Sequence, residues 1–492
     1  MRLAGKFMRK EEQEVTECHQ TSSGLYQPEY EHDACGVGMI VDIHGNKSHE
    51  LVDAALKVLE NMKHRGAEGA DNKTGDGAGI MLQIPHEFIL LQGIPVPEKG
   101  KYGTGLVFLP KDAKEQESIL SILIEEVERE GLSLMHLRSV PVNSSILGKS
   151  ALETEPDIKQ VFITGATDLE NFERTLYIVR KKIERRVHHK DFYIVSLSSK
   201  NIIYKGMLSS VQVREYFQDL TQPYFTSGLA IVHSRFSTNT FPTWSLAQPF
   251  RLLAHNGEIN TIRGNADKML AREENMESEY LKNEMHKLIP VVNPNGSDSA
   301  RLDNTLEFLV MSGMDLPHAI MITIPEPWEN NKVISQEKRD FYQYYATMME
   351  PWDGPASIIF TDGDQVGAVL DRNGLRPSRY YITDDDQLIL SSEIGVLDID
   401  PTKIVVKERL HPGKMLLVDT IKGKVIADDV VKEKYAEKEP YGEWLDSNLL
   451  ELKDLKIPNE PVPTYGAEER EKLMKAFGLP LKSQNHDIPN RG

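Results

Sequence analysis

The stretch from Ala356 to Ser392 limits the possible folds of this chain more than any other. It contains the short apolar runs ASIIF, QVGAVL, SRYYIT and LILSS, separated by the turn clusters TDGD, DRNGLRP and DDDQ. Runs of this length, bounded by Gly, Asp, Asn and Pro, are typical of β-strands joined by turns. Asn373-Gly374 is a dipeptide that favours hairpins. The sequence therefore predicts a meander of antiparallel strands here, followed by a further hairpin formed by KMLLVD and KVIAD.

Other segments combine strands with helices that have one apolar face. A strand is predicted at 36–42, and a helix follows, with its apolar stripe between Leu51 and Met62. Similar stripes predict helices around 119–127, 172–183 and 302–310. The runs FYIVSL and NIIYKG, separated by SSK, predict a hairpin. This mixture favours an α+β fold with four layers in the order αββα, in which two stacked antiparallel sheets are flanked by helices.

Composition argues against several classes of partner. The 492 residues include 57 basic and 75 acidic side chains, a formal net charge of -18, which opposes long-range attraction to nucleic acid or to an anionic membrane. The sequence has no uninterrupted apolar run of membrane-spanning length, and its first residues lack the apolar core of a secretory signal. We expect an enzyme or binding protein for small molecules.

The cysteines and histidines do not form a metal-binding pattern. The only cysteines are Cys18 and Cys35, so no disulfide framework and no Cys-Xaa-Xaa-Cys pair exists, and a reducing cytoplasm is expected. His32, His64, His233, His255 and the pair His188-His189 lack helical spacing with a third ligand. We therefore expect no metal site, and we expect His233 and His255 to support a site through hydrogen bonds.

Three regions follow from the distribution of apolar residues. Residues 1–34 are polar and lack a periodic apolar stripe, which indicates a leader or propeptide. Residues 35–430 are expected to form one globular domain. Residues 431–492 are charged and include the proline-rich IPNEPVPTYG, which indicates a C-terminal extension or linker.

Cys35 in HDACGVG has two interpretations. A lone cysteine before a strand is usually a small buried hydrophobic residue. Alternatively, cleavage between Ala34 and Cys35 would free an α-amine with a pKa of about 7.7 to 8.0, which could take the proton of the thiol on the same residue. Only other parts of the chain can distinguish these interpretations.

Separate motifs favour the second interpretation. Together with Cys35, HSRFSTN, AHNGEINTIRGN and GSDS resemble the class II glutamine amidotransferases, which are N-terminal nucleophile hydrolases. The stretches HRGAEGADNKTGDGAGI, HNGEINTIRGN and DRNGLRPSRYYIT are similar to the amidotransferase domain of glutamate synthase large subunits. The resemblance extends over residues 24–430.

The resemblance implies a role for each matching residue. Cys35 would attack the side-chain amide of L-glutamine, forming a thioester and releasing ammonia. Asn256 and the N–H of Gly257 would stabilise the oxyanion. The substrate contacts would be Arg235 for the α-carboxylate, Asp298 for the α-ammonium and, to a lesser extent, Thr238. Taken singly, Arg235 could be a surface ion pair, Asn256-Gly257 a turn and Asp298 a helix cap.

The resemblance also implies a partner. Glutamate synthase large subunits continue into an FMN-binding (β/α)8 barrel, a 3Fe–4S cluster and a β-helix, and this sequence ends before them. No cofactor is therefore expected in this chain, and ammonia would pass to a synthase domain or subunit. The alternatives are an amidotransferase for another acceptor, such as an amino sugar or a purine precursor, and a subunit that binds glutamine without catalysis.

Overall fold

A computed structural model describes residues 35–165, 169–237, 240–281, 284–450, 452–455 and 464–477. The predicted leader, residues 1–34, lies outside the described residues. The chain divides into two compact units between Gly442 and Glu443. The expectation that residues 35–430 form one globular domain stays a prediction. Helix α12 (Asp428–Ala436) packs against β15 (Met415–Asp419) within the first unit.

A seven-stranded antiparallel sheet carries Cys35 at the start of one of its central strands. Its strands lie in the order β14 (Ile404–Arg409), β12 (Arg379–Thr383), β13 (Gln387–Ser391), β1 (Gly36–Asp42), β8 (Leu229–Ser234), β2 (Ala78–Gln83) and β7 (Asn201–Gly206). The strand predicted at 36–42 is confirmed as β1. Helix α1 (His49–Asn61) packs on β1 and β8. A Cβ on Gly38 would lie 2.8 Å from Val58 of α1, so this glycine permits the close approach of the helix.

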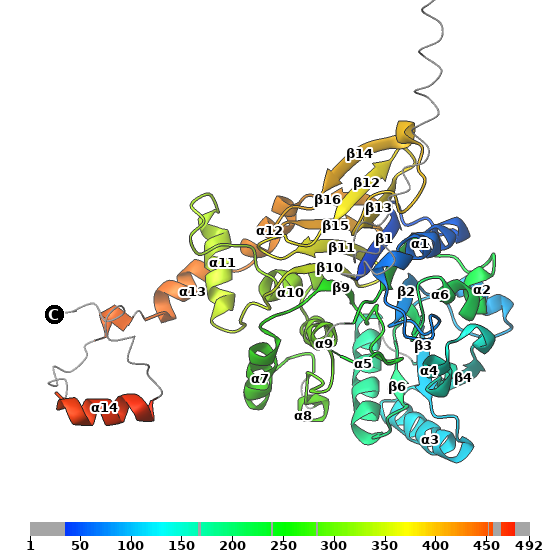
Figure 1. The fold of residues 1–492 in the computed structure, drawn as a ribbon, viewed down its shortest axis with the longest axis horizontal. Coiled ribbons are helices and arrows are strands. Elements are labelled where there is room, and N and C mark those ends of the chain that lie inside the picture. The colour runs from blue at the N-terminus through cyan, green and yellow to red at the C-terminus, as the bar shows by residue number, and fades with distance from the viewer. Residues whose placement is uncertain are drawn as a thin grey trace, which may run out of the picture. The chain divides into compact units, whose positions relative to one another are not determined.

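A five-stranded antiparallel sheet faces the first. Its strands lie in the order β16 (Lys424–Ile426), β15, β11 (Gln365–Leu370), β10 (Ala356–Thr361) and β9 (Leu253–Gly257). Along β10, Ile359 contributes to the core shared with the seven-stranded sheet, whereas Ile358 and Phe360 contribute to a core with α9 (Asp298–Met311) and α10 (Leu316–Thr323). This alternation follows from the two-residue period of a strand. The predicted αββα sandwich is confirmed (Figure 1).

A third sheet supplements the sandwich and was not predicted. Its order is β4 (Ser133–Ser139), β5 (Asp157–Thr164), β3 (Tyr102–Leu109) and β6 (Tyr193–Ile194), and α3 (Ala113–Arg129) and α5 (Leu169–Arg186) share a core with it. The remaining α-helices are α2 (His86–Leu91), α4 (Lys149–Glu153), α6 (Gln212–Tyr216), α7 (Ile262–Arg272), α8 (Met285–Leu288), α11 (Gln336–Ala346), α13 (Tyr441–Asn448) and α14 (Ala467–Ala476).

The predicted hairpin of FYIVSL and NIIYKG is wrong. β6 pairs with β3, and β7 pairs with β2 in a different sheet. After β6 the chain continues along β3, where the N–H of Val195 donates to the carbonyl of Leu106. The turn that follows is held by Glu173, whose carboxylate accepts hydrogen bonds from Ser198 and Ser199. Tertiary partners thus separate two runs that are adjacent in sequence.

The meander predicted at 356–392 forms only as two separate hairpins. β10 pairs with β11 and β12 pairs with β13, but β11 and β12 belong to different sheets. Residues 371–378 therefore cross from one layer to the other, and Asn373-Gly374 is not a hairpin turn. The Asp371 carboxylate accepts from the N–H groups of Asn373 and Gly374, which stabilises this crossing. The hairpin predicted from KMLLVD and KVIAD is confirmed as β15 and β16.

Among the described residues, no helix has the length and apolar character needed to cross a membrane.

Candidate active site

The two stacked sheets bring the ends of several elements together at Cys35. Gly36 of β1 is opposite Ser234 of β8, so Cys35 lies beside Arg235. Asn256 and Gly257 end β9 in the other sheet, and Asp298 begins α9. Five of the six predicted site residues, together with Arg376 from the crossing at 371–378, line one cavity of about 330 Å³.

The Cys35 thiol is half-buried, and its hydrogen bonds are to main-chain groups. The N–H of Phe236 donates to Sγ at 3.3 Å, and Sγ lies 3.5 Å from the Phe236 carbonyl. Burial raises the pKa of the Cys35 thiol, and the hydrogen bond from Phe236 and the charge of Arg235 oppose this rise. The thiol therefore needs a proton acceptor before it can attack.

Arg235 is held in place by groups around its guanidinium. Its guanidinium donates to the carbonyl of Asp76 at 3.3 Å and to the hydroxyl of Thr240 at 2.6 Å. The carboxylate of Asp76 accepts from the N–H of Ser237 at 2.7 Å. Burial lowers the pKa of Arg235, whereas Cys35, Asp76 and Asp298 act in the opposite direction. The guanidinium is thus a buried cation at the cavity wall.

Asp298 supplies a negative group to the same cavity. Its Oδ2 accepts from the N–H of Ile259 at 3.0 Å and its Oδ1 from the N–H of Ser299 at 2.7 Å. Ser297 caps α9 by accepting from the N–H of Ala300. The position predicted for Asp298, at the start of a helix, is confirmed. Because its carboxylate is bound to main-chain groups, its place in the cavity is fixed.

Asn256 and Gly257 provide an amide side chain and an unusual backbone. Asn256 is buried, and its Oδ1 has no hydrogen-bond partner among the described residues. Gly257 has a φ of +149°, and a Cβ there would lie 1.9 Å from the carbonyl oxygen of Pro355. Only glycine fits at this position. An unpartnered buried amide at a cavity wall is a group available to a ligand.

His255 lines the cavity, and His233 contacts it from behind. His255 Nδ1 lies 2.8 Å from the hydroxyl of Ser299, and His233 Nε2 lies 3.1 Å from the carbonyl of His255. Burial lowers the pKa of His233 to about 3 and also lowers the pKa of His255. Both rings are therefore neutral near pH 7, and they order the end of β9.

The structure adds residues that the sequence did not indicate. Arg376, Asp76 and Thr240 border or support the cavity, and none was predicted as a site residue. Arg376 is in the crossing between the sheets, so its place depends on the topology. Asp76 lies in the glycine-rich turn before β2, where the Gly77 carbonyl also accepts from the Arg235 N–H. Thr238 lies outside the described residues.

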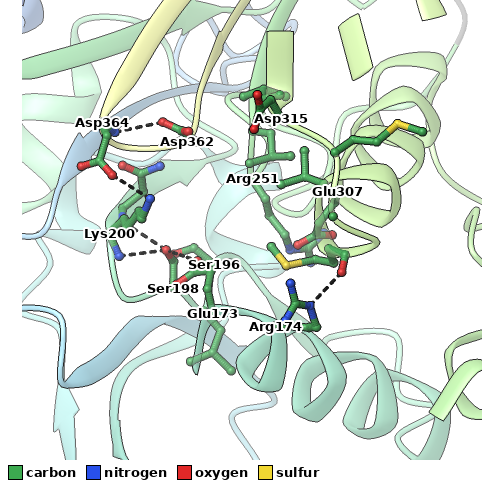
Figure 2. Close-up of a pocket in the computed structure, with 18 residues that line it drawn as sticks. Glu173, Arg174, Ser196, Ser198, Lys200, Arg251, Glu307, Asp315, Asp362 and Asp364 are labelled. Atoms are coloured by element: carbon green, nitrogen blue, oxygen red, sulfur yellow. Dashed lines mark hydrogen bonds and ion pairs between the residues drawn. The ribbon is translucent and has the colours of Figure 1, made fainter. Parts of the chain in front are cut away.

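A second cavity, of about 400 Å³, does not include Cys35 (Figure 2). Several of its charged groups are already paired: Lys200 contacts Asp364 at 2.7 Å, and Glu173 accepts from Ser198. Across the parts of the chain that the structure describes, no group of three or more His, Cys, Asp or Glu residues could hold a metal ion. The cavity at Cys35 combines a cysteine nucleophile with groups of both charges.

Comparison with known proteins agrees with this geometry. The family described as glutamine amidotransferases class-II matches residues 35–444, and the chain belongs to this family. It is 47% identical over 480 residues to the glutamate synthase [NADPH] large chain of Bacillus subtilis, covering 95% of this chain and 31% of that one. Identity to the glutamate synthase [NADH] of Schizosaccharomyces pombe is 44%, covering 94% of this chain and 23% of that protein.

A further relative is the ferredoxin-dependent glutamate synthase 2 of Synechocystis, 45% identical over 84% of this chain and 27% of that one. The expected resemblance to glutamate synthase large chains is thus confirmed. The chain spans about a third or less of the length of these relatives. It is an enzyme with the glutamine-hydrolysing role of class II amidotransferases.

The buried ring of His233 predicts a pH dependence of stability. Its folded pKa of about 3 lies below its unfolded value of about 6.5, so its contribution is present above pH 6.5 and is lost as the pH falls toward 3. When the pH falls from 7.5 to 5.0, the free energy of unfolding should decrease in both proteins. We expect the decrease to be about 2 kcal/mol smaller in His233→Gln than in the wild type. Urea unfolding at both pH values measures this difference.

The control is His411→Gln, which removes a ring on a residue that is exposed to solvent. It should keep the wild-type difference between the two pH values. The same pH dependence in His233→Gln and in the wild type would contradict the buried neutral ring.

Proposed function

We propose that the chain hydrolyses L-glutamine through a thioester on Cys35 after removal of residues 1–34. The observation that carries this proposal is the convergence of Cys35, Arg235, Asn256 and Asp298 on one cavity. The thiol sulfur attacks the side-chain carbonyl carbon of glutamine, and its proton passes to the freed α-amine of Cys35. The amine then protonates the departing nitrogen, which leaves as ammonia. Water cleaves the thioester, releasing glutamate and restoring the thiol.

The α-amine fits the surroundings of the thiol. Among the described residues, the hydrogen bonds of Cys35 Sγ are to the main chain of Phe236, and no carboxylate or imidazole is bonded to it. His255, the histidine of the cavity wall, directs Nδ1 to Ser299. A base attached to the nucleophile removes the need for either group.

The charged groups suit a free amino acid. A guanidinium can form a bidentate pair with the α-carboxylate, which supports Arg235 in that role. The carboxylate of Asp298 would accept from the α-ammonium. The amide of Asn256 and the N–H of Gly257 would donate to the oxyanion of the tetrahedral intermediate. Thr238 keeps its proposed role as a lesser substrate contact.

Removal of the leader is the first prediction of this mechanism. Intact-mass analysis of active protein should show an N-terminus at Cys35, because residues 1–34 block the amine. Cys35→Ala should abolish release of ammonia from glutamine, whereas Cys18→Ala, in the leader, should leave it unchanged. Glutaminase activity in protein that retains Met1 would rule out the amine as the base.

Asn256 and Asp298 should affect different kinetic constants. Asn256→Ala should lower kcat by about 10²- to 10³-fold, because one oxyanion donor is lost. Asp298→Asn removes the charge and keeps one acceptor oxygen, so one of the N–H groups of Ile259 and Ser299 loses its partner. It should raise KM by about 10- to 100-fold. Steady-state glutaminase kinetics separate the two effects.

Asp267→Asn is the matched control, since Asp267 is exposed on α7. It should change neither constant more than twofold. If Asn256→Ala altered only KM and Asp298→Asn altered only kcat, the two roles would be reversed.

We also propose that the ammonia is used by a glutamate synthase module, as the names of the relatives suggest. The proposed site of action is the cytoplasm. FMN and a 3Fe–4S cluster would belong to that module. The two cysteines of this chain support this division, because they are too few to ligate such a cluster.

The chain alone should hydrolyse glutamine slowly and should not oxidise NAD(P)H when 2-oxoglutarate is added. Slow hydrolysis is expected because loops near Arg235 and Asn256 would close fully only with the acceptor module. The assay measures both reactions, with bound flavin determined first. If the chain alone oxidised NAD(P)H in a reaction dependent on 2-oxoglutarate, the proposal that a separate synthase module is needed would be wrong.

A further inference from the structure

A third cavity lies beside the glutamine cavity and is bordered by three arginines. Its volume is about 220 Å³, and its walls include Arg376, Arg379 and Arg409 together with Leu375 and Pro412. Arg376 comes from the crossing between the sheets, Arg379 begins β12 and Arg409 ends β14. We call these three residues the arginine cluster.

The arginine cluster places positive charges close to one another. Arg379 and Arg409 are directly opposite each other in the antiparallel pair of β12 and β14. Like charges at such positions repel. None of the three arginines has an ion pair with a carboxylate among the described residues, and Arg376 Nε is buried without a hydrogen-bond acceptor. Although the chain has a net charge of -18, no carboxylate is among the described residues that line this cavity.

A neighbouring arginine shows the ordinary arrangement. Arg372, in the same crossing, forms an ion pair with Asp353. The lack of partners is thus a property of the arginine cluster and not of the whole segment. Three guanidinium groups around one small cavity present N–H donors that match carboxylate or phosphate oxygens.

We propose that the arginine cluster binds a small dianion with carboxylate or phosphate groups. The volume is below the range of about 300 to 1,000 Å³ common for drug-sized ligands, which favours an anion of few atoms. A dianion would offset the repulsion between Arg379 and Arg409 and would accept hydrogen bonds from their guanidinium groups. The nonpolar wall from Leu375 and Pro412 would cover its carbon skeleton or one face.

Arg376 connects this site to catalysis. It lines both the arginine cluster and the cavity of Cys35, and its charge acts on the thiol. A bound dianion would neutralise part of the charge that Arg376 presents to the glutamine cavity. We expect the dianion to raise KM for glutamine about two- to fivefold. This regulatory step rests on the proposed glutaminase function, whereas binding of the dianion does not.

Isothermal titration calorimetry of the full chain tests the binding site. Succinate and inorganic phosphate are titrated separately at constant ionic strength, which distinguishes a dicarboxylate from a phosphate. We expect saturable binding of at least one of them with one site per chain. The double variant Arg379→Ala/Arg409→Ala should bind it at least tenfold more weakly while keeping the wild-type Tm.

The matched control is Arg129→Ala/Arg372→Ala, which removes the same net charge from two arginines that have carboxylate partners. It should bind the anion within twofold of the wild type. Absence of saturable binding of both anions, or equal weakening in the two double variants, would overturn the proposal. If Arg379→Ala/Arg409→Ala has a lower Tm than the wild type, Arg379→Gln/Arg409→Gln replaces it. That variant should also bind the anion at least tenfold more weakly.

Glutaminase kinetics then test the coupling. The anion that binds should raise KM in the wild type and have less than half that effect in Arg379→Ala/Arg409→Ala. No change of KM in an active wild type that binds the anion would overturn the regulatory step alone. A wild type that binds the anion but never hydrolyses glutamine would contradict the proposed function and leave the binding site established.

Discussion

The antiparallel pairing of β1 with β8 is the constraint on which the rest of the site depends. It places the residue before β1 beside the residue that follows β8, so Cys35 and Arg235 meet although they are separated by 200 positions in the sequence. The second sheet faces these strands and carries Asn256 and Gly257 at the end of β9. Because both sheets are buried between helices, the nucleophile stands on a rigid support.

Main-chain hydrogen bonds hold the charged groups of the site at fixed positions. Asp298 is bound to the N–H groups of Ile259 and Ser299, and Asp76 is bound to the N–H of Ser237. These contacts leave the opposite charges of Arg235 and Asp298 on one cavity wall without a direct ion pair between them. Such an arrangement is suited to a zwitterion, since each end of the ligand meets a group of opposite charge.

The segment that crosses from one sheet to the other brings Arg376 to the cavity of Cys35. Residues 371–378 leave the five-stranded sheet after β11 and join the seven-stranded sheet at β12. On this path Arg376 borders the cavity of Cys35, while Arg379 meets Arg409 across the edge pair of strands. Arg376 therefore borders both the glutamine cavity and the cavity that Arg379 and Arg409 line at the sheet edge.

Local sequence determined the elements and the chemistry of the individual residues. Apolar runs such as GVGMIVD became strands, one-sided stripes became α1, α3, α5 and α9, and Ser297-Asp298 began a helix. The motifs around Cys35, Arg235, Asn256 and Asp298 together indicated the chemical groups of one site. These features depend on near neighbours in the chain, so periodicity and motif spacing could predict them.

Only the tertiary structure decided which strands pair and which side chains meet. The sequence could not show that β6 joins β3 instead of β7, or that β11 and β12 lie in different sheets, because adjacent strands favour hairpins unless distant partners bury them better. Arg376 and Asp76 escaped prediction for the same reason. Their positions follow from the crossing and from the contact of the turn before β2 with Arg235. The long-range packing of two sheets, which no local pattern encodes, assembled the site.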